Sequence, residues 1–431
     1  MKQDRARKQA LLLLDEIISK HKYSNLTVKY GLAGFDDRDR AFITALVYGT
    51  LDKLIHLDYV LSLYAKGRLQ PKVQNLLRMG TYQILHMDRI PDSAAVDSSV
   101  SLAQSIGKGM LKGYINGVLR TVSREKEKIP YPKEDAARIS VQYSYPEFLV
   151  REMILQYGAA RTEEICAFEA KHSTCLRVNT EKITVPEFTK KLSVPWKYGQ
   201  YFEDCVSIDG EPCFLEEGLC SVQGEASMAV VRALAPQKGE KILDCCAAPG
   251  GKTVYIAQRM GQGSVTALDK HEHRVKLIEK NAQRCGVADR INAYIADMTK
   301  QQNLGIFDRV LADVPCSGLG VAGQKPEIKN TITPEKLAEL ETVQAEILEN
   351  ASQCVRQGGV LVYSTCTVRR AENEEIVKRF LAMHPDFILD SLKGSLGEKL
   401  EQGRETEKGF LQFYPDRDGI DGFFIARMKR I

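Results

Sequence analysis

The sequence lacks any apolar run approaching the roughly 18 residues needed to cross a bilayer, which excludes a membrane-spanning helix. The four consecutive leucines at 11–14 are also too few for the core of a signal peptide. No two cysteines stand at Cys-x-x-Cys spacing, and the seven histidines do not cluster with cysteines, so we expect no metal site. Eleven cysteines without an export signal indicate a reducing cytoplasm and free thiols.

The turn at residues 246–253 lacks the two common nucleotide-binding signatures. A phosphate-binding P-loop needs Gly, four residues and then Gly-Lys-Ser/Thr. Gly251, Lys252 and Thr253 fit this pattern, but Cys246 stands at the first glycine position. The dinucleotide fingerprint Gly-x-Gly-x-x-Gly is absent from this turn as well. A nucleotide hydrolase built on the near-match is an alternative, and it predicts magnesium dependence and no role for thiols.

The net charge of +4 is distributed unevenly along the chain. Residues 1–130 carry 21 Lys and Arg against 13 Asp and Glu, whereas the remaining residues carry 39 against 43. A basic N-terminal region joined to a near-neutral remainder favours docking to a polyanion. The alternative is a solvated helical surface, and charge alone favours neither.

The pattern of apolar residues predicts three parts. Residues 1–130 carry apolar residues at spacings of three and four, which predicts an all-helical domain with breaks at 31–39, 67–71 and 89–92. The polar segment 125–135 carries two prolines and is typical of a linker. Residues 136–220 combine two expected helices, one from near Pro146 and one over about 161–172, with short alternating segments, which predicts a small α+β module. Residues 221–431 are expected to form an α/β domain.

The segment KILDCCAAPGGK at 241–252 predicts a buried strand, a tight turn and the start of a helix. This is the first unit of a doubly wound sheet, in which ligands bind at the carboxyl ends of the strands. Gly250 and Gly251 lack a Cβ, so the backbone can approach a ligand closely. The next two expected strands, SVTALD and INAYIAD, end in Asp269 and Asp297.

Two carboxylates at neighbouring strand ends suit the ribose diol and adenine amine of a nucleoside with little phosphate charge. S-adenosylmethionine has this character, so the pattern favours methyl transfer. Asp269 could instead cap the helix that follows it, and Asp297 could be a loop residue facing solvent.

Two further strands are expected at 307–313 and 358–368, and both lead to thiols. Cys316 follows the first strand and Cys366 ends the second, above the same edge as the carboxylates. Carbon 5 of cytosine is a poor nucleophile, but a thiolate that adds to carbon 6 makes carbon 5 electron-rich enough to take a methyl group. A carboxyl group near ring nitrogen 3 would stabilise the developing charge, and Asp313 is the candidate. From the residues alone, the two thiols are nearly equal candidates for the nucleophile.

The motifs CAAPGGK (246–252), DVPCSG (313–318) and YSTCTVRRAENE (363–374), with carboxylates at 269 and 297, resemble the Sun/Nop2 family of RNA 5-methylcytosine methyltransferases. The segments RDRAFITALVYGTL and INGVLR resemble the helical RNA-binding domain of the antitermination factor NusB. The resemblance implies a cytoplasmic bacterial enzyme that uses S-adenosylmethionine to methylate a cytosine of small-subunit ribosomal RNA. We expect a monomer without a metal.

The fold implied by the resemblance is a Rossmann-like methyltransferase domain, a mostly parallel seven-stranded sheet with a C-terminal antiparallel hairpin. It follows an all-α NusB-like domain and a small α+β module. In the family the nucleophile falls on Cys366, and the cysteine that assists product release falls on Cys316. The implied cofactor contacts are Cys246, Ala247, Ala248, Pro249, Gly250, Gly251, Lys252, Asp269, Asp297 and Asp313.

The chain departs from the family pattern at two places. An acidic residue usually stands where this chain has Gly224, and basic residues often occupy the loop where it has Gly323 and Gln324. If that loop holds RNA phosphate, the second departure affects substrate affinity. A non-enzymatic alternative is an RNA-binding or ribosome-assembly factor that retains the fold, and it predicts RNA binding that survives loss of Cys366.

Overall fold

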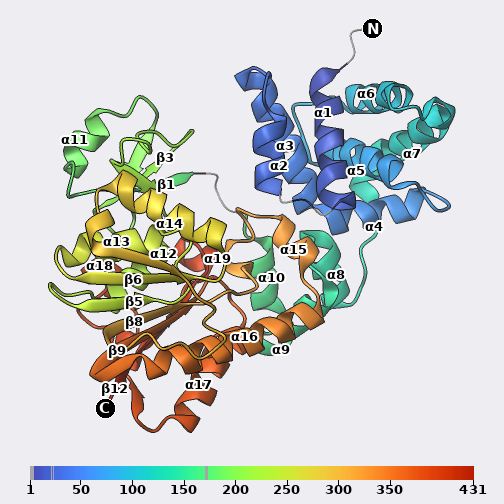
Figure 1. Ribbon diagram of the computed structural model, residues 1–431. Coiled ribbons are helices and arrows are strands. Elements are labelled where there is room, and N and C mark those ends of the chain that lie inside the picture. The colour runs from blue at the N-terminus through green and yellow to red at the C-terminus, as the bar shows by residue number, and fades with distance from the viewer. Residues whose placement is uncertain (1–3, 21, 23, 170–172) are drawn as a thin grey trace. The chain divides into compact units, whose positions relative to one another are not determined.

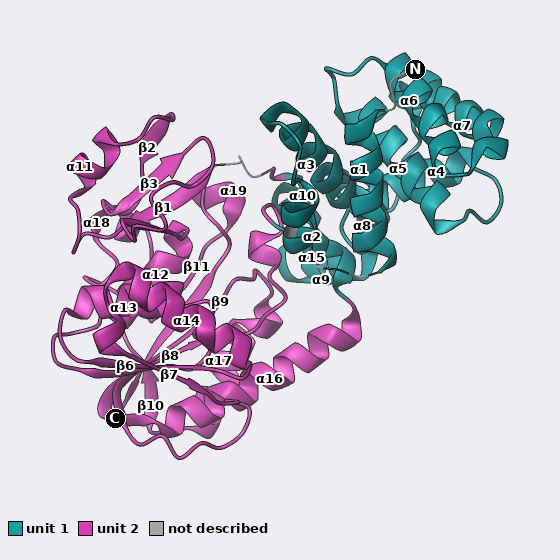
Figure 2. Ribbon diagram, turned by 45° about the horizontal axis from the view of Figure 1, so that its top comes forward, with its two compact units in different colours: residues 1–167, 325–332 teal, residues 168–324, 333–431 magenta. Residues whose placement is uncertain are grey.

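The computed structural model describes residues 4–20, 22, 24–169 and 173–431. Its contacts group into two units, coloured teal and magenta in Figure 2. The first comprises Met1–Ala167 and Lys325–Ile332, and the second comprises Phe168–Gln324 and Thr333–Ile431. The chain therefore passes between the units three times. None of the helices in the described residues is long and apolar enough to cross a membrane.

The first unit is all-helical, as the sequence predicted for residues 1–130 (Figure 1). The expected breaks separate helices, and two expected helical segments divide again, at Lys53 and near Gly107. Gly107 has a φ of +74°, a left-handed conformation that commonly ends a helix. The helices are α1 (Arg5–Leu14) with a π-turn (Asp15–Ser19), α2 (Ser24–Gly31), α3 (Asp37–Asp52), α4 (Leu54–Tyr64), α5 (Pro71–His86), α6 (Asp92–Ser105), α7 (Lys112–Glu125), α8 (Asp135–Tyr143), α9 (Glu147–Tyr157) and α10 (Ala159–Ala167).

Helices α8 to α10 lie where the sequence predicted the end of a linker and the start of the small module. α8 begins directly after the proline-rich segment, and the side chain of Glu134 accepts the N–H of Ala137 as its cap. α9 begins after Pro146, as expected. The helix expected over 161–172 is α10, which ends at Ala167, and 170–172 lie outside the described residues. All three helices group with the N-terminal ones.

A helix from the middle of the sequence, α15 (Glu327–Thr331), completes the first unit. Its Lys329 is buried and donates to Asp52 at 2.6 Å. Asn330 Nδ2 donates to the carbonyl of Leu51 at 2.7 Å. A buried lysine is tolerated because its charge is paired. These bonds fix α15 at the C-terminal end of α3.

The second unit begins with a small antiparallel sheet and α11, so the α+β module expected over 136–220 is smaller than predicted: its two expected helices, α9 and α10, group with the first unit. Its strands are ordered β2-β3-β1-β4. Leu176 and Val206, opposite each other in the sheet, pack on one face with Phe188 of α11. On the other face Arg177 is fully buried, and its guanidinium lies 4.4 Å from the centre of the Tyr255 ring. The elements are β1 (Thr174–Val178), α11 (Val185–Lys190), β2 (Trp196–Tyr198), β3 (Cys205–Ile208) and β4 (Cys220–Val222).

The large sheet has the predicted Rossmann-like character, but it has eight strands in the described residues, one more than the seven expected. Seven follow the order β10-β12-β9-β8-β5-β6-β7, and β11 pairs with β12. Strands β5 to β9 pair in parallel, and β10 to β12 pair antiparallel. The expected C-terminal hairpin is β11 with β12, but β12 is not the edge, because β10 lies outside it. The strands are β5 (Lys241–Asp244), β6 (Ser264–Asp269), β7 (Ile291–Ile295), β8 (Phe307–Asp313), β9 (Val355–Thr365), β10 (Phe387–Leu389), β11 (Phe410–Gln412) and β12 (Phe424–Arg430).

Helices cover both faces of this sheet, which explains its near-continuous apolar strands. Ile242 of β5 belongs to the core under α12, α13 and α14, whereas the next residue, Leu243, belongs to the core under α16 and α17. The helices are α12 (Glu225–Leu234), α13 (Gly251–Met260), α14 (Glu272–Cys285), α16 (Pro334–Gln353) and α17 (Glu374–Met383), with short α18 (Glu398–Glu401) and α19 (Pro415–Asp418).

Candidate active site

The carboxyl ends of the parallel strands gather the predicted site residues at one edge of the sheet. Asp269 ends β6, Asp297 follows β7, Asp313 ends β8 and Cys366 follows β9. Because β6, β7, β5, β8 and β9 are neighbours and run in parallel, these ends face one edge. The structure thus places the three aspartates and Cys366 at one edge of the sheet, where the sequence analysis expected them.

The glycine turn connects β5 to α13 at this edge. Gly250 has a φ of +104°, and a Cβ there would lie 3.1 Å from the Cα of Ile278, so glycine is required. The preceding backbone is held from α14: Asn281 Nδ2 donates to the Pro249 carbonyl at 2.7 Å. The N–H of Ala247 donates to a carbonyl of β6 at 2.8 Å. The turn is therefore a fixed part of the site, with the N-terminal end of α13 beside it.

Asp244, the last residue of β5, was missed by the sequence analysis. Its carboxylate is 1% exposed, and Oδ2 accepts a hydrogen bond from Thr253 at 2.7 Å. Oδ1 has no hydrogen-bond partner among the described residues. Burial raises the pKa of Asp244 to about 6. A buried, half-satisfied carboxylate is costly, so it indicates a position where a ligand donates. Its place directly before the Cys-Cys pair was the available signal.

Asp269 and Asp297 are oriented by hydrogen bonds from their own loops. Asp269 Oδ1 accepts the N–H of His271 at 3.0 Å. The N-cap of α14 is His271 and no side chain caps the helix, so Asp269 does not occupy the capping position that the alternative required. Asp297 Oδ1 accepts two bonds from Thr299, the stronger cause of its lowered pKa being the side-chain one. These hydrogen bonds fix the orientation of both carboxylates at the strand ends.

Lys252 reaches from the glycine turn to the thiol side of the edge. Its Nζ donates to Asp313 Oδ2 at 2.6 Å, and Ser364 Oγ donates to Asp313 Oδ1 at 2.6 Å. Burial opposes the charge on Lys252, but the nearby acidic groups, Asp313 foremost, together outweigh it, so the pKa of Lys252 is raised. The sequence placed Lys252 only among the cofactor contacts, and the structure adds this pair with Asp313.

The two predicted thiols lie in direct contact. Cys316 Sγ and Cys366 Sγ are 3.2 Å apart, and the N–H of Cys366 lies 3.2 Å from Cys316 Sγ. The loop after Cys316 is held to the other motif because the N–H of Gly320 donates to the Cys366 carbonyl at 3.0 Å. A Cβ on Gly320 would lie 1.9 Å from the carbonyl oxygen of Gly422, so this approach requires glycine.

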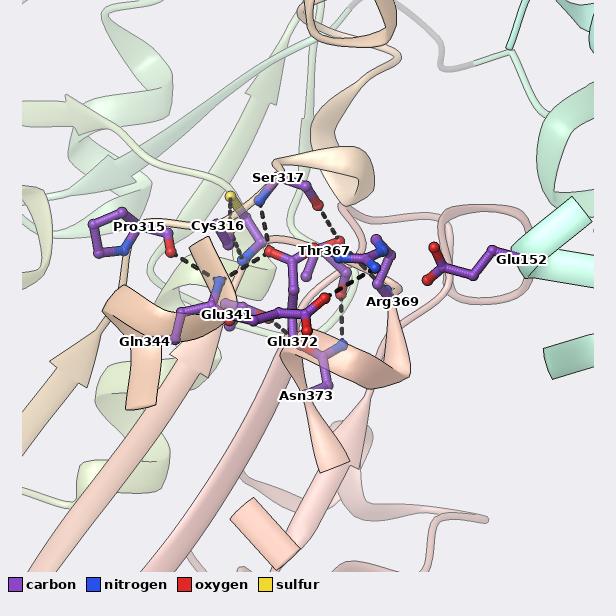
Figure 3. A network of polar contacts seen from close by, with 12 residues as sticks. Glu152, Pro315, Cys316, Ser317, Glu341, Gln344, Thr367, Arg369, Glu372 and Asn373 are labelled. Atoms are coloured by element: carbon purple, nitrogen blue, oxygen red, sulfur yellow. Dashed lines mark hydrogen bonds and ion pairs between the residues drawn. The ribbon is translucent and has the colours of Figure 1, made fainter. Parts of the chain in front are cut away.

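The immediate surroundings of Cys316 and Cys366 form a buried polar network (Figure 3). The side chains of Glu372 and Asn373 are fully buried within it. The hydrogen bond to Cys366, together with burial, holds the pKa of Cys316 well above its usual range. Within the described residues, no group of three or more His, Cys, Asp or Glu is placed to hold a metal ion.

The two departures from the family pattern meet at one carboxylate. A Cβ on Gly224, the N-cap of α12, would lie 2.9 Å from Asp421 Oδ2. Gln324 Nε2 donates to Asp421 Oδ1 at 2.7 Å. An acidic side chain at position 224 would therefore compete for the place where Asp421 already supplies a carboxylate.

The Gly224→Asp substitution is accordingly expected to destabilise the protein by about 1 kcal/mol at low salt, because it sets a second negative charge beside Asp421. Gly224→Asn adds nearly the same volume without the charge and is the matched control. Urea unfolding at low and high salt measures the difference. Equal stability of the two variants at low salt would contradict the repulsion.

Comparison with known proteins agrees with this geometry. A model of the 16S rRNA methyltransferase RsmB/F family matches residues 231–429, and a model of the NusB family matches residues 4–124. The chain is 39% identical over 450 residues to a probable ribosomal RNA small subunit methyltransferase B of Bacillus subtilis, with 100% of both chains covered. It is 34% identical to ribosomal RNA small subunit methyltransferase B of Serratia proteamaculans, with 92% of this chain and 91% of that one covered.

Solved structures share the fold. The crystal structure of PH0851 matches with a TM-score of 0.82 and 25% identity, covering 98% of each chain. A methyltransferase homolog protein from Pyrococcus horikoshii matches with a TM-score of 0.57 and 27% identity, covering 70% of this chain and 100% of that one.

Proposed function

Since the chain belongs to the 16S rRNA methyltransferase RsmB/F family, we propose that it methylates carbon 5 of a cytosine in small-subunit ribosomal RNA. The observation that carries this proposal is the thiol pair. Cys316 and Cys366 lie 3.2 Å apart at the strand edge that also holds Asp313 and Lys252. One thiolate can add to a pyrimidine ring, and the neighbouring thiol, carboxylate and ammonium group can assist the addition and its reversal.

S-adenosylmethionine supplies an electrophilic methyl group, and the residues present fit it. The orphan oxygen of Asp244 offers an acceptor to a donor group of the ligand. The carboxylates of Asp269 and Asp297 suit the hydroxyl and amine groups of an adenosine. The glycine turn 246–251 allows a close approach of backbone.

In the proposed mechanism, the Cys366 thiolate adds to carbon 6 of the cytosine. The new S–C bond moves the ring electrons toward carbon 5 and ring nitrogen 3. We propose that the proton taken up by ring nitrogen 3 passes through the carboxyl group of Asp313, which hydrogen bonds from Lys252 and Ser364 hold in place. After carbon 5 has gained its methyl group, a base removes the proton from that carbon, and the returning electron pair expels Cys366. Cys316 assists this release.

Two features support Cys366 rather than Cys316 as the nucleophile. The hydrogen bond to Cys366 and burial raise the pKa of Cys316 well above its usual range, which favours the protonated thiol at Cys316. Cys366 is also among the negative groups that raise the pKa of Lys252, so the ammonium group lies within electrostatic reach of this sulfur. A nearby cation favours a thiolate. The residues alone left the two thiols equal, and these contacts support the assignment that the family resemblance implied.

The alternatives fit less well. A P-loop hydrolase would need Lys252 for phosphate, but its Nζ is paired with Asp313, and the carboxylates at the edge would repel a phosphate. A silent assembly factor gives no reason for two thiols in contact. We further propose that the basic region at 1–130 contributes to RNA binding and that the protein acts as a cytoplasmic monomer without a metal.

The test is methyl transfer from labelled S-adenosylmethionine to unmodified small-subunit RNA, free and in the ribosomal particle, followed by nucleoside analysis. The expected product is 5-methylcytidine at one position. Label in any other nucleoside would contradict the carbon 5 assignment. RNA binding without transfer to either substrate would instead support the assembly factor.

A further inference from the structure

We propose that the consecutive residues Glu372 and Asn373 are the positioning element that sets the distance and orientation of the two thiols. The inference rests on the proposed function of the thiols. It comes from the network of Figure 3, in which Glu372 holds the segment that carries Cys316 and Asn373 holds the segment that carries Cys366. Both residues make hydrogen bonds to the backbone and side chains beside the thiols, and each acts through these neighbours.

On the Cys316 side, the backbone is held on both flanks. Glu372 Oε2 accepts the N–H of Ser317 at 2.7 Å. Gln344 Nε2 donates to the carbonyl of Pro315 at 3.0 Å and to the same Glu372 oxygen at 2.9 Å. The residues before and after Cys316 are therefore joined through one buried carboxylate, and rotation of this peptide segment would break bonds on both sides.

On the Cys366 side, Asn373 also holds both flanks. Its Oδ1 accepts the hydroxyl of Thr365 at 2.5 Å, and its Nδ2 donates to the carbonyl of Thr367 at 3.0 Å. Nδ2 also donates to Gln412 Oε1 at 2.8 Å, which fixes the orientation of the amide. The neighbouring peptide is anchored in turn, because the hydroxyl of Tyr363 donates to the carbonyl of Glu372 at 2.6 Å.

A direct hydrogen bond also links the segment that carries Cys316 to the segment that carries Cys366. The hydroxyls of Ser317 and Thr367, the residues that follow the two cysteines, lie 2.8 Å apart. Arg369 Nη1 pairs with Glu372 Oε1 at 3.1 Å. Adjacent residues of one peptide thus control both thiols, so a displacement at 372–373 changes the sulfur–sulfur geometry directly.

Isosteric substitutions separate positioning from bulk packing. Three donors, from Ser317, Gln344 and Arg369, point at the two oxygens of Glu372, so Glu372→Gln forces its amide N–H groups against a donor. Asn373→Asp likewise removes the donor to Thr367 and sets two oxygens against each other. Glu375→Gln, three residues after Glu372 on the exposed side of α17, is the matched control for the first change.

The two variants are expected to slow different steps of the reaction: Glu372→Gln the release of the adduct, and Asn373→Asp its formation. With labelled RNA, both should lower kcat on the order of 10²-fold while leaving the KM for S-adenosylmethionine unchanged, because a small misplacement of reacting groups is felt mainly in the chemical step. Glu372→Gln, which loosens Cys316, should accumulate a covalent RNA adduct on denaturing gels. Asn373→Asp, which loosens Cys366, should form adduct more slowly, including with RNA transcribed with 5-fluorocytidine, from whose carbon 5 no proton can be removed. Glu375→Gln should match the wild type.

The proposal would be overturned if the variants lost activity only in proportion to their lowered melting temperature and the fraction of adduct did not change. Wild-type kinetics in both variants would overturn it as well. A readout that needs no RNA separates this inference from the proposed function. A trivalent arsenical bridges two closely spaced thiols, and peptide mapping should find it across Cys316 and Cys366 in the wild type and less in both variants. If the wild type gives no 5-methylcytidine but the arsenical pattern holds, the proposed function fails and the positioning role stands. Equal bridging in all variants sinks the positioning role.

Discussion

Replacing Cys366 with alanine is expected to abolish methyl transfer, by on the order of 10⁴-fold or more, because loss of a covalent nucleophile removes the route itself and not one stabilising contact. Cys316→Ala should also fail to turn over, but for a different reason. The Cys366 adduct can still form, and its release is slowed, so a protein–RNA band should persist on a denaturing gel. Methyl transfer and adduct formation, measured on the same reactions, check both statements.

The matched control is Cys213→Ala, which removes a thiol from a loop of the small module and should leave both readouts unchanged. The roles would have to be exchanged if the adduct persisted in Cys366→Ala and was absent from Cys316→Ala. Full activity of Cys366→Ala would remove the covalent mechanism altogether. Because the attack precedes release, the double variant should be no less active than Cys366→Ala alone.

The second large effect is expected from Asp244→Asn, which should stabilise the ligand-free protein while weakening its affinity for S-adenosylmethionine. Burial raises the folded-state pKa of Asp244 to about 6, from 3.8. A carboxyl whose pKa is raised by folding destabilises the folded state wherever it must ionise, here by about 3 kcal/mol at pH 7. Asparagine can still accept the bond from Thr253 and carries no charge.

The sign of the pH dependence follows from this shift. The penalty is absent below pH 4, grows as the pH rises from about 4 to 6 and is complete above 6, so the stabilisation by Asp244→Asn should grow over the same interval. Affinity of the wild type for S-adenosylmethionine should fall below about pH 6, where Asp244 gains a proton. Urea unfolding and calorimetric titration between pH 4.5 and 8 would measure these two effects.

Asp308→Asn provides a control of opposite sign. The Lys241 N–H holds the pKa of Asp308 below its usual value, so this carboxylate stabilises the fold above about pH 4 and loses that contribution as the pH falls. Its removal should destabilise the protein at pH 7. An Asp244→Asn variant that is less stable than the wild type at pH 8 would contradict the assigned penalty.

The site residues that could be predicted from the sequence are those whose positions follow from the strand order of the fold. Strand ends in a doubly wound sheet share an edge, so Asp269, Asp297, Asp313 and Cys366 could be placed there without coordinates. Asp244 also ends a strand at this edge, but its burial and its oxygen without a donor become apparent only in the fold. Burial depends on packing from both faces of the sheet, which no local pattern states.

Other features depend on contacts between distant segments. Lys252 was expected to serve the cofactor, and only the fold reveals its bond to Asp313, 61 residues along the chain. Gly224 and Gln324 likewise both lie beside Asp421, which is about 200 residues from the first and about 100 from the second in the sequence. The edge position of β10 was missed because its three residues carry too short a pattern to recognise.

The placement of α15 has a consequence for how this architecture can be taken apart. Residues 325–332 lie between segments of the second unit in the sequence but belong to the first, where Lys329 is buried against Asp52. A fragment that starts at residue 168 would therefore carry this lysine without its counter-charge. For the same reason, exchanging the N-terminal region between relatives at a single junction would separate α15 from its partners. A chimaera that keeps α15 with its partners therefore has to be joined at three places.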